Sequence, residues 1–90
     1  MIRAVFGKNR LTVEGHAGYA PKGQDIVCAA VSALVYALIG TLEETENVAE
    51  MVLRPGYAAV EAKKKTAAFD LVRCGLTQLA DRYPEFVQVK

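Results

Sequence analysis

The stretch from Ile26 to Glu44 restricts the possible folds of this 90-residue chain more than any other segment. Its apolar residues recur nearly all round a helix of 3.6 residues per turn, instead of forming one narrow stripe. These residues are Ile26, Val27, Ala30, Val31, Leu34, Val35, Leu38 and Ile39. A helix of this kind is covered on several sides, so we predict that it lies at the centre of the fold.

The length of the chain leaves room for one core only, and we predict that residues 1–90 form a single domain. A chain of this size buries about 60–65% of the surface that its unfolded form exposes. Because 52% of the residues are nevertheless hydrophobic, we expect part of the apolar surface to be buried against a second copy. A homodimer is therefore the expected oligomeric state.

The charge pattern gives no electrostatic reason to expect nucleic acid or a membrane as the main partner, because the net charge is only +1 and both signs are interspersed. The first ten residues lack the long apolar core of a signal peptide. Small and polar residues interrupt the apolar run from Ile26 to Leu42, which we interpret as too short for a membrane helix. We expect a cytoplasmic protein with two free thiols.

Two hairpins are predicted from the remaining pattern. Strands are expected over residues 2–8 and 11–14 around a turn at Asn9-Arg10, and over residues 48–54 and 57–63 around Pro55-Gly56. In the second turn, proline presets φ at one position and glycine accepts a positive φ at the next.

A second helix is predicted over residues 66–82, before Pro84. The residues expected to face the core are Ala67, Leu71, Cys74, Leu76 and Leu79. Residues 86–89 alternate between apolar and polar and add a closing strand. The order ββαββαβ predicts an α+β fold, with a mostly antiparallel sheet of about four to five strands packed with two helices.

The only histidine, His16, and one of the two cysteines, Cys28, lie within the segment from Gly15 to Leu34. Asp25 is well placed to cap the helix, which puts Cys28 in the first turn. There the backbone N–H groups and the helix dipole favour a thiolate and can hold an oxyanion. The loop over residues 17–24 can bring His16 back to take the thiol proton, so the pattern points to nucleophilic catalysis.

Other interpretations of these residues stay open. Free cysteine is among the most buried residue types, so Cys28 is also explained as a packing residue, as we expect for Cys74. One histidine and two cysteines without a CxxC pair fall short of a structural zinc site and disfavour a redox dithiol. We predict no metal and no cofactor.

The segment resembles the signature of the Prp (YsxB-like) family of ribosomal-processing cysteine proteases. The matching residues are Gly15-His16-Ala17, Tyr19, Gly23 and Asp25-Ile26-Val27-Cys28-Ala29-Ala30-Val31-Ser32. Chain length and element order also fit, so the resemblance covers the whole domain. A GHA motif followed by DIVCAAVS is specific, because no generic periodicity produces it.

The resemblance implies a homodimeric bacterial endopeptidase with Cys28 as the nucleophile and His16 as the general base and then acid. The implied substrate is the short N-terminal extension of large-subunit ribosomal protein number twenty-seven, cut after a Phe-Phe pair. It implies no membrane partner, and contact with nucleic acid only incidentally on the ribosome.

Two neighbours of the pair have two interpretations each. The resemblance suggests Asp25 as a third member that orients the imidazole, and helix capping explains the same residue. Ser32 lies one turn after Cys28 on the same helix face, where it lines the pocket, steadies the pair or eases helix packing.

The residues of the loop also have alternatives. Gly15, Gly18 and Gly23 are expected to let the loop open and close over substrate, or to form plain turns. Tyr19 lies on a bound peptide or packs on the base of its own loop.

Two other functions compete with the protease. One is a noncatalytic ribosome-associated or RNA-binding assembly factor that uses Lys63–Lys65 and Arg73, although three lysines in a near-neutral chain are weak support. The other is a small thiol-dependent hydrolase or redox protein with a different substrate.

Overall fold

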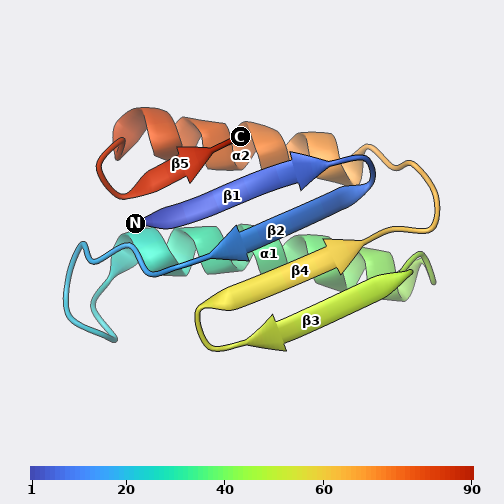
Figure 1. Ribbon diagram of the computed structural model, residues 1–90, viewed down its shortest axis with the longest axis horizontal. Helices are drawn as coiled ribbons and strands as arrows, with labels where there is room; N and C mark the ends of the chain where they lie inside the picture. The colour runs from blue at the N-terminus through green and yellow to red at the C-terminus, as the bar shows by residue number, and fades with distance from the viewer.

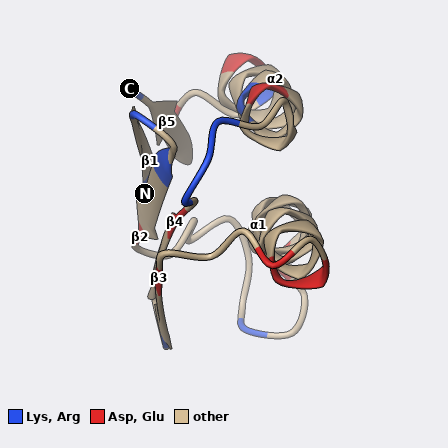
Figure 2. Ribbon diagram, turned by 90° about the vertical axis from the view of Figure 1, so that its right-hand side faces the viewer, with Lys and Arg blue, Asp and Glu red and all other residues tan.

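One five-stranded sheet carries two helices on a single face in the computed structural model, which describes residues 1–90 (Figure 1). The elements are β1 (Ile2–Gly7), β2 (Arg10–Glu14), α1 (Ile26–Glu44), β3 (Glu50–Arg54), β4 (Tyr57–Glu61), α2 (Ala68–Arg82) and β5 (Val87–Val89). A view along the sheet shows both helices on the same side (Figure 2). The predicted α+β class and the order ββαββαβ are confirmed.

The strands lie in the order β3-β4-β2-β1-β5. Three neighbouring pairs are antiparallel, which confirms the mostly antiparallel sheet, and β1 pairs with β5 in parallel. The parallel pair arises because α2 crosses the helical face before the chain enters β5.

The hairpin turns hold the β1–β2 and β3–β4 pairs in register. The Pro55-Gly56 turn is confirmed, because Arg54 pairs with Tyr57 and Gly56 has a φ of +75°. The first turn lies one residue earlier than predicted, at Lys8-Asn9, and Asn9 has a φ of +55°. Asparagine tolerates this left-handed conformation better than most residues, which fixes the turn there.

Helix α1 has the predicted bounds, but the chain itself covers only part of it. Its buried residues form one stripe that packs on the sheet, namely Val27, Val31, Val35, Leu38, Ile39 and Leu42. On the opposite side Ile26 and Tyr36 are 57% and 61% exposed. Within one chain the sheet covers one face and α2 packs beside the helix, while cover of the remaining side by a second copy stays a prediction.

The predicted core face of α2 is also wrong in part. Ala67, Leu71 and Cys74 are exposed, whereas Leu76 is fully buried, as predicted. Two apolar stripes compete on this helix, and the sheet and α1 bury the one that contains Phe69 and Leu76. That stripe includes the larger aromatic side chain, so its burial removes more apolar surface from water.

The interpretation of the apolar run from Ile26 to Leu42 as too short for a membrane helix is wrong by length and composition alone, because α1 has 19 residues and a mean hydropathy of 2.0. The core helix of a compact domain has the same composition, and here the helix packs its buried stripe on the sheet.

Candidate active site

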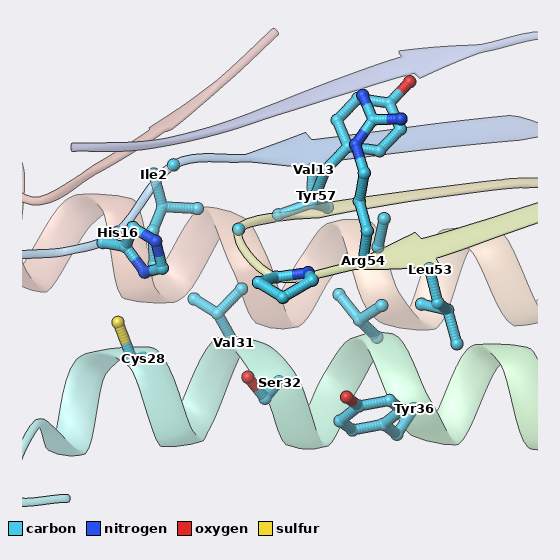
Figure 3. A pocket seen from close by; sticks show the side chains of 15 residues that line it. Ile2, Val13, His16, Cys28, Val31, Ser32, Tyr36, Leu53, Arg54 and Tyr57 are labelled. Atoms are coloured by element: carbon cyan, nitrogen blue, oxygen red, sulfur yellow. The ribbon is translucent and has the colours of Figure 1, made fainter. Parts of the chain in front are cut away.

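The end of β2 and the start of α1 meet at one edge of the molecule, and the loop between them joins His16 to Cys28 (Figure 1). The backbone N–H of Ala17, the residue after His16, donates a hydrogen bond to Cys28 Sγ at 3.3 Å. The half-buried Cys28 points its sulfur towards the His16 ring, which is exposed (Figure 3). The two residues are thus brought together as the motif predicts, while their catalytic roles stay a prediction.

Asp25 holds the loop on the helix start. Its Oδ1 accepts the N–H of Cys28 at 2.9 Å, and its Oδ2 accepts those of Tyr19 and Ala20 at 3.0 and 3.4 Å. The hydrogen bond from the Cys28 N–H is the main cause that lowers the pKa of Asp25, and the N–H groups of Ala20 and Tyr19 lower it further. The helix-cap interpretation is confirmed. None of these hydrogen bonds goes to His16.

Gly15 is held in place by its surroundings. Its φ is +96°, and a Cβ at this position would collide with the carbonyl oxygen of Met1. Its N–H donates to the carbonyl oxygen of Gly56 at 2.9 Å. Gly18 and Gly23 also have positive φ, with no neighbour near an added Cβ. The turn interpretation explains all three glycines, and loop opening stays a prediction.

Tyr19 packs on a segment that sequence reasoning did not connect with it. Its ring meets those of Tyr83 and Phe86 edge to face, with centroid distances of 5.6 and 5.3 Å. These two residues follow α2, so Tyr19 fastens the loop to the end of the chain rather than to its own base.

A cavity of about 460 Å³ extends from the pair between α1 and the β3–β4 hairpin (Figure 3). Cys28 and His16 lie at one end of it, and the exposed Ser32 and Tyr36 follow along α1. Leu53 of β3 lies across from Tyr36. Ser32 therefore lines the pocket, as one of its interpretations predicts. The lining is mostly hydrophobic, so the cavity suits apolar side chains.

Two contributions to the site were missed by sequence reasoning, the backbone N–H of Ala17 and the contact between Gly56 and His16. The Pro55-Gly56 dipeptide does predict a turn. Its position over His16 depends on the register between β2 and β4, which the sequence pattern does not show.

Residues 1–88 match the family model described as cysteine protease Prp. The chain belongs to this family. The ribosomal processing cysteine protease Prp of Mycoplasma pneumoniae is 33% identical over 91 residues, which cover 97% of this chain and 91% of the relative. The protein of the same name from Mycoplasma genitalium is 31% identical over 95 residues, with coverage of 99% and 94%.

Solved structures agree with the fold. The Streptococcus mutans protein SMU.848 is 34% identical and has a TM-score of 0.78, with coverage of 100% of this chain and 92% of that chain. The ribosomal processing protease Prp from S. aureus, solved with a covalently linked product peptide, has a TM-score of 0.83 at 15% identity, with coverage of 99% and 95%.

Membership of the Prp family confirms the predicted resemblance and makes the chain a cysteine protease by family. It favours the protease interpretation over the RNA-binding assembly factor and over the redox protein. The structure brings no three His, Cys, Asp or Glu side chains together in a way that would hold a metal ion.

Proposed function

We propose that this Prp family member is an endopeptidase in which Cys28 is the nucleophile and His16 the general base. The observation that supports this most directly is the hydrogen bond of 3.3 Å from the Ala17 N–H to Cys28 Sγ. It attaches the residue next to His16 to the sulfur, in the first turn of α1 and at one end of the cavity.

The reaction follows from these two side chains. His16 accepts the thiol proton, and the Cys28 thiolate attacks the carbonyl carbon of the scissile peptide bond. The C–N bond then breaks as the imidazolium of His16 returns the proton to the leaving amine. The remaining thioester on Cys28 is hydrolysed by water, whose proton His16 takes, and the thiol is restored.

The backbone N–H of Ala17 is the proposed donor to the oxyanion of the tetrahedral intermediate. Both N–H groups have an acceptor in the resting state, Asp25 for Cys28 and the sulfur for Ala17, but the sulfur becomes a weaker acceptor once it has bonded to carbon and so frees the Ala17 N–H. The Ala17 N–H lies at the sulfur, next to the carbon that the sulfur attacks. Donors aimed at the position where charge develops lower the barrier of acyl transfer.

The proposed substrate is the N-terminal extension of bacterial large-subunit ribosomal protein number twenty-seven, cut after a Phe-Phe pair. The family resemblance implies it, and the Mycoplasma relatives are named as ribosomal processing proteases. The mostly apolar cavity that begins at Cys28 and His16 and extends to Tyr36 and Leu53 agrees with a substrate that carries large apolar side chains near the cleaved bond. A ribosomal protein as substrate places the enzyme in the cytoplasm.

A homodimer is proposed as well. Ile26 and Leu71 are more than half exposed although they are large and apolar. Burial of such a surface against a second copy removes it from water. Light scattering after gel filtration measures the mass, and a mass of one chain at micromolar concentration contradicts the dimer.

The function is tested with a synthetic peptide that carries Phe-Phe before a small residue, with cleavage followed by mass spectrometry. We expect a single cut after the second phenylalanine. Both Cys28→Ala and His16→Ala lower the rate by at least about 10³-fold, as removal of a nucleophile or its base does in other proteases. Cys74→Ala, the matched control, cleaves normally, and a Cys28→Ala variant that still cleaves contradicts the assignment.

A further inference from the structure

The turn of the β3–β4 hairpin lies close to the imidazole of His16, and both line the same cavity. The strands are joined by Pro55-Gly56, and Gly56 lies in the left-handed region with a φ of +75°. The carbonyl oxygen of Gly56 accepts the N–H of Gly15 at 2.9 Å, which attaches the turn to the residue before His16. The position of the turn relative to the imidazole is therefore fixed by the backbone.

A side chain on Gly56 would crowd the ring of His16. A Cβ added to Gly56 would lie 3.0 Å from Nε2 of His16, 3.5 Å from Cε1 and 3.7 Å from Cδ2. The first distance is tighter than ordinary van der Waals contact, so a side chain at position 56 pushes the ring away by a few tenths of an ångström.

The ring of His16 is exposed, and no hydrogen bond of the structure involves either ring nitrogen. The resemblance suggested that Asp25 orients the imidazole as a third member. Its oxygens accept hydrogen bonds from backbone N–H groups instead. The turn at Gly56 is thus one of the features near the ring on the side of the sheet.

We propose that Gly56 is a positioning residue for His16. The bare backbone of the turn limits how far the imidazole turns away from Cys28, and glycine suits this position because a Cβ there would lie 3.0 Å from Nε2 and displace the ring. The proposal rests on the proposed roles of His16 and Cys28. In a catalytic triad a carboxylate orients the imidazole by a hydrogen bond, whereas here the backbone at Gly56 would orient it by steric contact, without a charge.

Two substitutions of Gly56 distinguish the effect of the contact with His16 from the effect of backbone strain in the turn. Gly56→Ala adds a Cβ and also strains the left-handed turn, whereas Gly56→Asn adds the same Cβ in a residue type that tolerates positive φ. Gly23→Ala, at a φ of +89° with nothing near the new Cβ, measures the effect of strain alone on the thermal midpoint.

We expect both Gly56 variants to lower kcat by about 10- to 100-fold with KM changed less than about threefold, because a small displacement of a catalytic group reduces the rate and not the binding. Normal kcat in Gly56→Asn overturns the proposal, since strain then explains the loss in Gly56→Ala. A raised KM with normal kcat overturns it too, because the turn would then bind substrate.

His16 is the only histidine, so its ring protons are resolved in NMR spectra without assignment of other rings. We expect nuclear Overhauser contacts between these protons and the Gly56 α protons, and shifted ring signals in both Gly56 variants. Absence of the contact in the wild-type protein overturns the proposal. Because this measurement needs no turnover, it tests the restraint of the ring by Gly56 separately from the proposed function, which the peptide assay tests.

Discussion

Helices α1 and α2 lie side by side on one face of the sheet, and each carries one cysteine (Figure 2). Helix α1 begins with a side-chain cap from Asp25, and Cys28 lies in its first turn. Helix α2 begins after Ala67, whose side chain makes no cap hydrogen bond, and Cys74 lies about two turns inside the helix.

The surroundings of the two sulfur atoms differ as well. Cys28 Sγ accepts a backbone N–H from the loop that carries His16, whereas Cys74 Sγ accepts only the side-chain amide of Gln78 at 3.5 Å. Cys28 is half-buried beside a cavity, and Cys74 is exposed. The two residues are of the same type, so position in the helix, the neighbouring loop and burial distinguish the candidate site from a surface thiol.

The largest change in the free energy of unfolding is expected from a substitution in the buried face of α2. Leu76→Ala removes a fully buried side chain and lowers the free energy of unfolding by about 2–5 kcal/mol. Leu71→Ala, on a residue that is 73% exposed, changes it by less than about 0.5 kcal/mol. Urea unfolding of both variants measures the difference. Equal losses contradict the observed face of α2 and favour the face that the sequence predicted.

The second prediction compares the two thiols directly. We expect iodoacetamide at neutral pH to modify Cys28 about 10- to 100-fold faster than Cys74, because the thiolate is the reactive form and the start of α1 favours it. Peptide mapping by mass spectrometry gives both rates in one sample. Exposure alone predicts the opposite order, so faster modification of Cys74 contradicts an activated Cys28.

A smaller effect is expected from the cap of α1. The pKa of Asp25 lies below its ordinary value of 3.8, so its charge stabilises the folded state at a pH above that value. This stabilisation is lost as the pH falls through the lower pKa of the folded state. We expect the thermal midpoint of the wild-type protein to fall more steeply below about pH 4 than that of Asp25→Asn. Parallel pH curves contradict the prediction.

The smallest effect is expected at Ser32. Its side chain lines the cavity but makes no hydrogen bond in the structure, and it is exposed. Ser32→Ala changes the stability by less than about 0.5 kcal/mol, and we expect kcat to change less than about twofold. Peptide cleavage measures this, and a loss comparable to that of His16→Ala would make Ser32 part of the catalytic group.

Local signals in the sequence were sufficient for much of the fold. The bounds of α1 and the Pro55-Gly56 turn follow from capping and from the φ preferences of single residues, which act within a few positions. The motif also identified His16 and Cys28, because their proximity needs only one short loop. The buried face of α2 was predicted only in part, with Leu76 and Leu79 right and Ala67, Leu71 and Cys74 wrong, since two apolar stripes compete there and the sequence does not say which one meets the sheet.

The sequence by itself determined the order of the elements, the cap at Asp25 and the pair of residues joined by one loop. Only the tertiary structure decided that the β3–β4 turn lies over His16 and that Tyr19 packs on Tyr83 and Phe86. Hairpins and caps depend on neighbours in the chain, whereas these contacts join segments about 40 to 70 residues apart. Such contacts depend on strand register and packing, which no local pattern encodes.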